Sequence, residues 1–254
     1  MNLILLEPGE IQADGTAFLS DDRARHIREV LRATPGASLR IGMVDGPLGR
    51  VKVVALVPAV QLECHLAGAT PPRPPVDLLL AMPRPKVMKR LWPVLAALGV
   101  GRILITNAWK TERNYFDTHV LAADFVRAQL IAGLQQAGDT RLPEVSVYRQ
   151  FKKAVTALTA GGPYAAQLVA HPGPAAFPHA ALAALPAASR IVLAVGPEGG
   201  WVPYELEWLA ARGFAARHLD DCATLRGRGL PRRAVAGADA GEFGLVGVAA
   251  SAAG

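Results

Sequence analysis

A glycine-rich segment, Gly196-Pro197-Glu198-Gly199-Gly200, has the residue types and spacing best suited to hold a ligand. It follows directly on the apolar run Ile191–Val195, which predicts a buried strand, and Pro203 begins a predicted helix that Gly213 ends. Glycines at such a point let backbone groups approach a flat ligand without interference from Cβ atoms, and the helix start adds the positive end of its dipole. We therefore predict a ligand-binding loop at residues 196–200.

The glycine spacing of this loop argues against the most familiar cofactor-binding class. The dinucleotide fingerprint needs Gly-x-Gly-x-x-Gly and an acidic residue on a second strand about 20 residues later, and neither is present. A hydride-transferring enzyme is therefore disfavoured. Taken alone, an isolated Gly-x-x-Gly-Gly is more often an ordinary strand-to-helix turn, so the nature of the ligand must come from the rest of the sequence.

Basic residues indicate a polyanionic partner. The net charge is +6, and 21 of the 27 basic residues are Arg, whose planar guanidinium suits phosphates and base edges. Between Met82 and Arg113, seven basic residues stand against Glu112 alone. With a second basic cluster near the N-terminus, the candidate nucleic-acid contacts are Arg23, Arg25, Arg28, Arg32, Arg84, Lys86, Lys89 and Arg113. A solvated, Arg-rich face explains the same charge without any partner.

Composition argues against several other classes of protein. No stretch approaches the roughly 18 apolar residues of a membrane span, and the N-terminal run MNLILLEPGE lacks the basic region of a secretory signal. Cys64 and Cys222 fit no metal-ligand spacing and are expected to be reduced thiols. We therefore expect a cytoplasmic protein with no membrane segment and no metal site.

The first part of the chain predicts a small β-rich domain. Ser20 is a suitable N-cap for a helix that Pro35-Gly36 closes, with Ala24, Ile27 and Leu31 on one face. Strand-like runs follow at Ser38–Met43, Arg50–Val57 and Val60–Leu66. A proline-rich stretch then predicts a linker. We place one domain at residues 1–70 and a second at 76–254.

Strands and helices alternate in the second domain. Apolar strands are predicted at Val76–Ala81, Arg102–Thr106, Val145–Tyr148, Gln167–Ala170 and Ile191–Val195. Helices are predicted at Lys86–Leu98 with a kink at Pro93, at Val120–Ala137 and at Gln150–Leu158. This alternation is typical of a parallel α/β sheet, in which ligands bind outside the carboxyl ends of the strands. The loop at 196–200 stands at such an end.

Several segments resemble one known family. The segment Ile191–Phe214, IVLAVGPEGGWVPYELEWLAARGF, looks like the signature of the RsmE-type 16S ribosomal RNA uridine N3-methyltransferases, which are members of the SPOUT (trefoil-knot) superfamily. Ser20–Ile41 is similar to the family's N-terminal PUA-like domain, whose pattern is matched by His26, Val30, Leu31 and Arg32. LAALGVGRILI and Gly133–Val145 also resemble family segments, although Ala97 stands where an acidic residue is more usual.

This resemblance implies methyl transfer from S-adenosylmethionine to N3 of a uridine in 16S ribosomal RNA of the small ribosomal subunit. It also implies a SPOUT α/β trefoil-knot domain preceded by a PUA-like RNA-binding domain, usually in a homodimer. By position in the family's three cofactor loops, the cofactor-binding residues are Leu168, Val169, Ala170 and His171, then Gly196, Pro197, Glu198, Gly199 and Gly200, then Leu219 and Leu225.

Two residues are candidates for catalysis. Arg226 falls where the family has the arginine of its third loop, which implies a role in catalysis or in positioning the base. Glu198 is a candidate to act on the N3 proton, but a helix-start residue favoured by the helix dipole explains it equally well.

The C-terminal segment departs from the family pattern. Residues 223–254 contain 9 Ala and 7 Gly among 32 residues and show no helical apolar period, where the family has an amphipathic helix. Each interior Gly disfavours a helix by about 1 kcal/mol relative to Ala. A change of reading frame after Leu219 and a divergent native tail both explain this composition. The alternative function is therefore a PUA-containing RNA-binding protein whose methyltransferase activity is impaired or lost.

Overall fold

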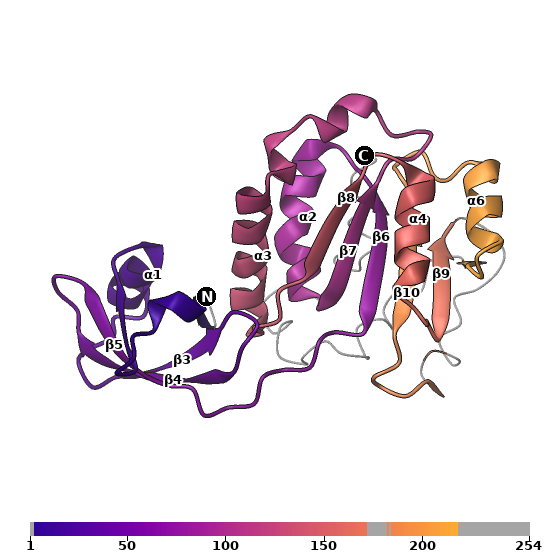
Figure 1. Cartoon of the computed structure of the whole chain (residues 1–254). Coiled ribbons are helices and arrows are strands. Elements are labelled where there is room, and N and C mark those ends of the chain that lie inside the picture. Colours follow the sequence, from indigo (N-terminus) through magenta and orange to yellow (C-terminus); the bar gives the residue numbers. More distant parts are fainter. Residues whose placement is uncertain (1–2, 172–181, 183, 218–254) are drawn as a thin grey trace. The chain divides into compact units, whose positions relative to one another are not determined.

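The computed structural model describes residues 3–171, 182 and 184–217 of the chain (Figure 1), which divides into two compact units. Unit 1 comprises Met1–Arg73 and Leu134–Leu142, and unit 2 comprises Pro74–Gly133 and Pro143–Gly254. Within the described part of the chain, no helix is both long and apolar enough to cross a bilayer.

Unit 1 is built on a five-stranded sheet with the order β1-β3-β4-β5-β2. The strands are β1 Ile4–Leu6, β2 Thr16–Leu19, β3 Ser38–Met43, β4 Leu48–Ala55 and β5 Val60–His65. β1 pairs with β3 in parallel, and the other neighbours are antiparallel. Alternate residues of β4, among them Val51 and Val53, point into the core, as expected for a sheet with one covered face. The β-rich character predicted from the sequence is confirmed.

The helix of unit 1 differs from its prediction in two ways. Asp21, not Ser20, is the N-cap of α1 (Asp22–Arg25), because the Asp21 carboxylate accepts from the backbone N–H of Arg23 at 2.9 Å. A π-helical turn, His26–Val30, then follows. Its wider hydrogen bonding shifts the register, so Ile27 is buried whereas Leu31 is 41% exposed rather than facing the core.

Residues 134–142 belong to unit 1, although they are distant in sequence from its strands. The backbone N–H of Leu3 donates to the carbonyl of Gln135 at 3.1 Å, and the Thr140 hydroxyl donates to the Gly46 carbonyl at 2.7 Å. Thr140 is completely buried. These contacts lie within unit 1, which includes the last residues of the helix α3 (Ala123–Ala137).

Unit 2 contains a six-stranded sheet whose paired neighbours are all parallel, in the order β11-β9-β10-β6-β7-β8. Its strands are β6 Val76–Ala81, β7 Val100–Thr106, β8 Glu144–Tyr148, β9 Ala166–Ala170, β10 Ile191–Val195 and β11 Ala215–Arg217. The predicted parallel α/β sheet is confirmed.

The helices of unit 2 connect these strands. They are α2 Pro85–Ala97, α3 Ala123–Ala137, α4 Phe151–Ala160 and α6 Pro203–Ala210. Two short 3-10 turns, η3 Arg113–Phe116 and η4 His119–Leu121, precede α3, so this helix begins later than the predicted Val120. α4 and α6 share one hydrophobic cluster with strand residues such as Leu79 and Val192. In Figure 1, α4 lies against the sheet and runs along its strands, and α2 and α3 lie beside one another.

A buried carboxylate joins several segments at the amino end of β6. Asp77 is 1% exposed, and its Oδ2 accepts from the guanidinium of Arg190 and, at 2.6 Å, from the Tyr164 hydroxyl. Arg102 of β7 lies 3.5 Å from the same oxygen. Burial, together with the hydrogen bond to Asp77, raises the pKa of Tyr164 well above its ordinary value. This paired cluster stabilises one end of the sheet and leaves the carboxyl ends of the strands for a ligand.

Candidate functional site

The strand order of unit 2 reverses between β6 and β10. After β6 the chain adds β7 and β8 on one side, whereas β9, β10 and β11 lie on the other. Because crossover connections are right-handed, helices that leave β6 and β10 in opposite directions cover opposite faces of the sheet. Parallel α/β proteins bind ligands outside the carboxyl ends of the strands at such a reversal.

The glycine loop at residues 196–200 begins at this reversal. All five residues of β10 are buried, and the loop turns sharply after them, with the Gly200 N–H donating to the Pro197 carbonyl at 2.7 Å. Gly200 has φ +72°, a conformation that L side chains rarely adopt. The structure thus places the predicted loop at the carboxyl end of a central strand.

The three glycines of the loop are needed for different reasons. A Cβ on Gly196 would lie 3.1 Å from the Trp201 ring, and one on Gly199 would lie 2.8 Å from Cδ of Lys110. A Cβ on Gly200 would have no neighbour within 4 Å. The buried Trp201 thus leaves little room for a Cβ at Gly196, whereas the exposed Lys110 side chain could move away from one at Gly199. Gly200 is set by its backbone conformation and adjoins open space.

The end of β9 lies beside this loop. β9 and β10 pair in register up to Ala170 and Val195, which brings His171 next to Gly196. Leu168 and Val169 are buried in the sheet, and Ala170 and His171 are half-buried. Nδ1 of His171 is buried without a hydrogen-bond partner in the described part of the chain. The fold thus brings two of the three predicted cofactor segments together and leaves a polar atom there for a further partner.

The sequence left two roles open for Glu198, one at the start of the next helix and one in acting on the N3 proton. In the structure Glu205, not Glu198, is the acidic residue at the start of α6. Glu205, 3% exposed, accepts from the backbone N–H groups of Val202 at 3.0 Å and Trp109 at 2.8 Å, so it satisfies the start of α6. Glu198 makes no such contact in the described residues; its carboxylate lies 3.9 Å from Nε of Arg84 and is 22% exposed. Glu198 therefore lies in the glycine loop without a role in capping α6. Leu219, Leu225 and Arg226 lie outside the described residues.

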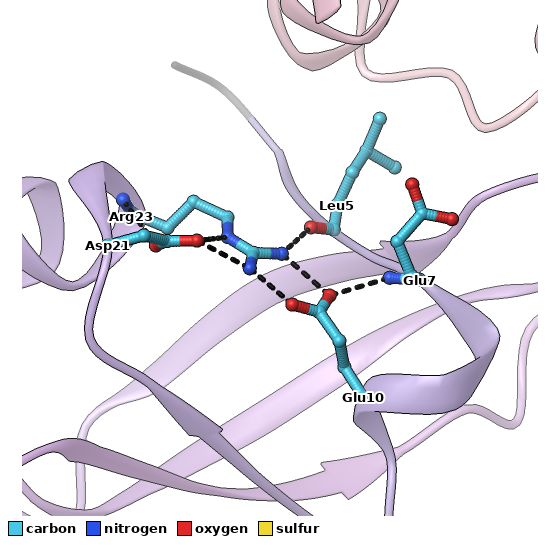
Figure 2. Close-up of polar contacts among 5 residues, drawn as sticks. All are labelled: Leu5, Glu7, Glu10, Asp21 and Arg23. Atoms are coloured by element: carbon cyan, nitrogen blue, oxygen red, sulfur yellow. Dashed lines mark hydrogen bonds and ion pairs between the residues drawn. The ribbon is translucent and has the colours of Figure 1, made fainter. Parts of the chain in front are cut away.

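Arg23 is held inside unit 1. Figure 2 shows its guanidinium between the carboxylates of Glu10 and Asp21, with a further hydrogen bond to the Leu5 carbonyl at 2.8 Å. Burial opposes the charge of Asp21, but hydrogen bonds and attraction from Arg23 outweigh it and lower the Asp21 pKa. The same guanidinium lowers the pKa of Glu10. Arg23 therefore has a structural role, although its sequence context suggested a nucleic-acid contact.

The other basic candidates are more accessible. Arg28 is half-buried and donates to the Leu56 carbonyl at 2.9 Å, whereas Arg25 and Arg32 are exposed. Arg84, Lys86 and Lys89 are exposed around the start of α2, and Arg113 is exposed at the start of η3. The first turn of α2 carries no acidic residue and no side-chain cap. Cations there oppose the helix dipole, so this end of α2 is strongly electropositive.

Residues that the sequence did not single out also approach the loop. Lys110, in the segment after β7, donates from Nζ to the Gly199 carbonyl at 2.6 Å. Glu205 stands three residues after Val202, a spacing typical of an acid that satisfies a helix start, and this was its only sequence signal. Among the described residues, no cluster of three or more His, Cys, Asp or Glu side chains has the arrangement of a metal site.

Comparisons of sequence connect the chain to RNA modification. A family model described as an RNA methyltransferase domain matches residues 70–226. The chain is 31% identical over 158 residues to ribosomal RNA small subunit methyltransferase E of Treponema pallidum, a match that covers 58% of this chain and 56% of the relative. It is 24% identical over 160 residues to ribosomal RNA small subunit methyltransferase E 1 of Borreliella burgdorferi, covering 61% of this chain and 65% of the relative. The chain thus spans less than two thirds of either relative.

Comparisons of structure agree on the fold. A ribosomal RNA small subunit methyltransferase E from Neisseria gonorrhoeae, bound to S-adenosyl methionine, superposes with a TM-score of 0.62 at 20% identity, covering 85% of this chain and 88% of that one. A methyltransferase from Legionella pneumophila in complex with the same cofactor gives a TM-score of 0.63 at 19% identity, covering 86% and 88%. These likenesses extend over both units of the chain.

Proposed function

Because this chain belongs to the RNA methyltransferase domain family, we propose that it transfers a methyl group from S-adenosylmethionine to N3 of a specific uridine in 16S ribosomal RNA of the small ribosomal subunit. The observation that carries the proposal is the glycine loop at residues 196–200, which meets the end of β9 where the strand order reverses. The resemblance of Ile191–Phe214 to the RsmE signature gives the proposal its substrate.

The residues of this site suit the cofactor. Gly200 offers open space beside a backbone turn, and the unpartnered Nδ1 of His171 offers a polar contact. Leu168, Val169, Ala170 and His171 would form one wall of the site and residues 196–200 another. Leu219 and Leu225 are assigned to the third wall by their position in the sequence alone. The relatives with known structures that bind S-adenosyl methionine support the assignment through their shared fold.

The chain's own part in the reaction is alignment and proton removal. S-adenosylmethionine supplies an electrophilic sulfonium methyl, so the protein must chiefly hold the uridine N3 in line with the methyl group and help remove the N3 proton. Glu198, accessible and 3.9 Å from Arg84, is our candidate to act on this proton. Arg226 is our candidate for positioning the base.

The finer architecture forms part of the same proposal. Residues 76–254 would form a SPOUT trefoil-knot domain, and residues 1–70 a PUA-like domain that binds RNA. The active species would be a homodimer in the cytoplasm, where small ribosomal subunits are modified. The support is the resemblance of the chain to the RsmE-type family together with the α/β sheet and the separate β-rich unit described above.

The decisive test is mass mapping of 16S ribosomal RNA from a strain that lacks the gene. We expect the loss of one N3-methyluridine, its return with the wild-type gene, and little return with Glu198→Gln. Calorimetry should show that Glu198→Gln still binds S-adenosylmethionine. Unchanged 16S RNA would disprove the substrate, and a wild-type protein that binds RNA but no S-adenosylmethionine would instead indicate an RNA-binding protein without methyltransferase activity.

A further inference from the structure

A cavity of about 530 Å³ lies at the carboxyl ends of β7 and β8, apart from the glycines at 196–200. Its walls come from the segment after β7, from the start of α4 and from the first turn of α6. Cavities of this volume hold small ligands and single nucleotides. The residues that matter for its chemistry are Trp109, Thr111, Arg113, Lys152, Tyr204 and Glu205.

Trp109 is an exposed aromatic side chain on a firmly held backbone. Its side chain is 82% exposed, whereas its backbone N–H donates to the buried Glu205 carboxylate at 2.8 Å. The next residue, Lys110, is attached to the Gly199 carbonyl by its Nζ at 2.6 Å. Its backbone is thus attached to α6 and to the glycine loop, while the indole projects into solvent. An exposed aromatic face on a held backbone is suited to stacking on a nucleobase.

Positive charge borders the same cavity. The Lys152 ammonium lies 5.3 Å from the Tyr204 ring centroid and 4.3 Å from that of Trp208, so these rings orient it. Arg113 is exposed at another wall. The N-cap of α4, Gln150, makes no side-chain capping bond, which leaves the positive end of this helix beside Lys152. Among the described residues that line the cavity, Glu205 is the one anion, and it stands against the two cations Lys152 and Arg113.

A buried polar atom in the cavity wall also lacks a partner. Thr111 is 7% exposed, and none of the described residues provides a hydrogen bond to its hydroxyl. A buried hydroxyl without a partner is unfavourable, because it has lost its hydrogen bonds to water. A bound polar ligand, or a water molecule held with it, would satisfy this group.

We propose that this cavity binds a single-stranded segment of the substrate RNA, with a base stacked on Trp109 and adjacent phosphates on Lys152 and Arg113. The proposal rests on the proposed function, and it adds a binding surface beside the cofactor loop. Aromatic and cationic groups together fit RNA because each nucleotide presents both a flat ring and a negative charge. Lys110 and Glu205 connect the Trp109 segment to the glycine loop and to α6, so RNA bound here would lie close to the transferred methyl group.

Two neighbouring lysines of α4 allow a matched test of the phosphate contact. Lys152 lines the cavity, whereas Lys153 is exposed and does not. We would measure the affinity of a single-stranded oligouridine of about twelve nucleotides, a length that spans typical binding sites, by fluorescence anisotropy at several salt concentrations. Lys152→Ala should weaken binding several-fold. It should also make the negative slope of log affinity against log salt shallower by about 0.7. Lys153→Ala should leave the slope unchanged, and equal effects of the two variants would overturn the proposal.

The stacking contact is tested by two variants of one residue. Trp109→Ala should weaken oligouridine binding about tenfold, and Trp109→Phe should restore most of the affinity, because either aromatic ring stacks on a base. Binding of the oligouridine should also quench tryptophan fluorescence in the wild type and quench it less in Trp109→Phe. Unchanged affinity of Trp109→Ala would contradict the assignment.

Further measurements separate this proposal from its alternatives. Thermal unfolding should be nearly unchanged in these variants, because Trp109 and both lysines are exposed. Sedimentation would show whether Trp109→Ala alters the association of two copies; a changed association with unchanged RNA affinity would mean that the surface is a protein interface and would overturn the proposal. Each variant should retain the wild-type affinity for S-adenosylmethionine. If the wild type fails to bind S-adenosylmethionine, the proposed function is wrong. The oligouridine measurements would still test whether the cavity binds RNA.

Discussion

Gly200 is the residue of the cofactor loop at which backbone conformation alone excludes a side chain. At Gly196 the buried Trp201 ring crowds the position of a Cβ, and at Gly199 the Lys110 side chain would have to move aside. At Gly200 that space is open, yet φ is +72°. A Val at any of these positions would therefore disturb the local structure of the loop. Its effect on cofactor affinity could not be separated from that disturbance. A smaller change at Gly200 gives the cleaner experiment.

We expect Gly200→Ala to weaken S-adenosylmethionine binding about tenfold or more. The left-handed conformation is unfavourable for Ala by roughly 1–2 kcal/mol, so the turn that presents its backbone to the ligand would relax. Gly36→Ala in unit 1 is a matched control, because Gly36 has φ +89° and likewise has no atom near its Cβ position. Both variants should lose similar stability in thermal unfolding, whereas calorimetry should show lost affinity only for Gly200→Ala. Equal affinities would remove Gly200 from the binding site.

Among the elements of unit 1, the start of the chain is held together by one arginine. Arg23 of α1 contacts the Leu5 carbonyl of β1, the Glu10 carboxylate of η1 (Pro8–Glu10) and the N-cap Asp21 (Figure 2). Its side chain is 17% exposed, so these ion pairs are partly shielded from water. Arg25, by contrast, pairs with Asp22 where the two side chains are 63% and 86% exposed. Such exposed pairs contribute little to stability.

Arg23→Ala should therefore lower the free energy of unfolding near neutral pH by about 1–2 kcal/mol, a figure that allows for solvent screening at the half-exposed Asp21. The pKa values of Glu10 and Asp21 are lowered in the folded state, so their contribution is present above their unfolded pKa of about 4 and is lost as the pH falls through the folded values. The difference between Arg23→Ala and wild type should shrink as the pH falls below about 4. Urea unfolding at several pH values measures it, with Arg25→Ala as the control; a pH-independent difference would mean that packing, not charge, is responsible.

The elements themselves show what sequence patterns can and cannot predict. Long apolar runs such as Val76–Ala81 and Ile191–Val195 are strands with the predicted bounds, because continuous burial in a parallel sheet leaves a clear local signal. The strands β1, β2 and β11 were not predicted, since three or four residues carry too little pattern and depend on distant partners for their pairing. Leu31 was misplaced because a π turn follows no fixed sequence rule.

The candidate site was predictable only where it is local. Residues 196–200 form one contiguous loop after a buried strand, so composition and position were enough to identify them. The cavity beside Trp109 joins three segments that are far apart in sequence, and its walls exist only in the folded chain. The structural role of Arg23 likewise depends on Glu10, thirteen positions away. Charge alone therefore suggested an RNA contact for Arg23, whose guanidinium is bound by carboxylates within unit 1.

At the scale of the whole molecule, the excess of positive charge lies in unit 2, because unit 1 contains as many acidic as basic residues. Arg25 and Arg32 are exposed in unit 1, and Lys86 and Lys89 are exposed in unit 2. Unit 2 therefore carries the net charge of +6, whereas contacts of unit 1 with RNA would depend on its exposed arginines rather than on a net charge. If both units contact the same RNA, the number of counterions released on binding is the sum of their contributions, and the salt dependence of binding measures that sum.

We expect two double variants to weaken the salt dependence of binding: Arg25→Ala with Arg32→Ala, and Lys86→Ala with Lys89→Ala. Each should make the negative slope of log affinity against log salt shallower by roughly 1–1.5 for single-stranded RNA. The variant with all four changes should show about twice this change in slope, because charges on separate units act independently. Arg40→Ala with Lys52→Ala removes two exposed charges of unit 1 that lie outside the candidate set, and it should leave the slope unchanged. Affinity for S-adenosylmethionine should stay at the wild-type value throughout. A slope that becomes shallower with only one pair would confine the RNA contact to one unit, and a slope that becomes equally shallow with the control pair would show that net charge, rather than any particular surface, attracts the RNA.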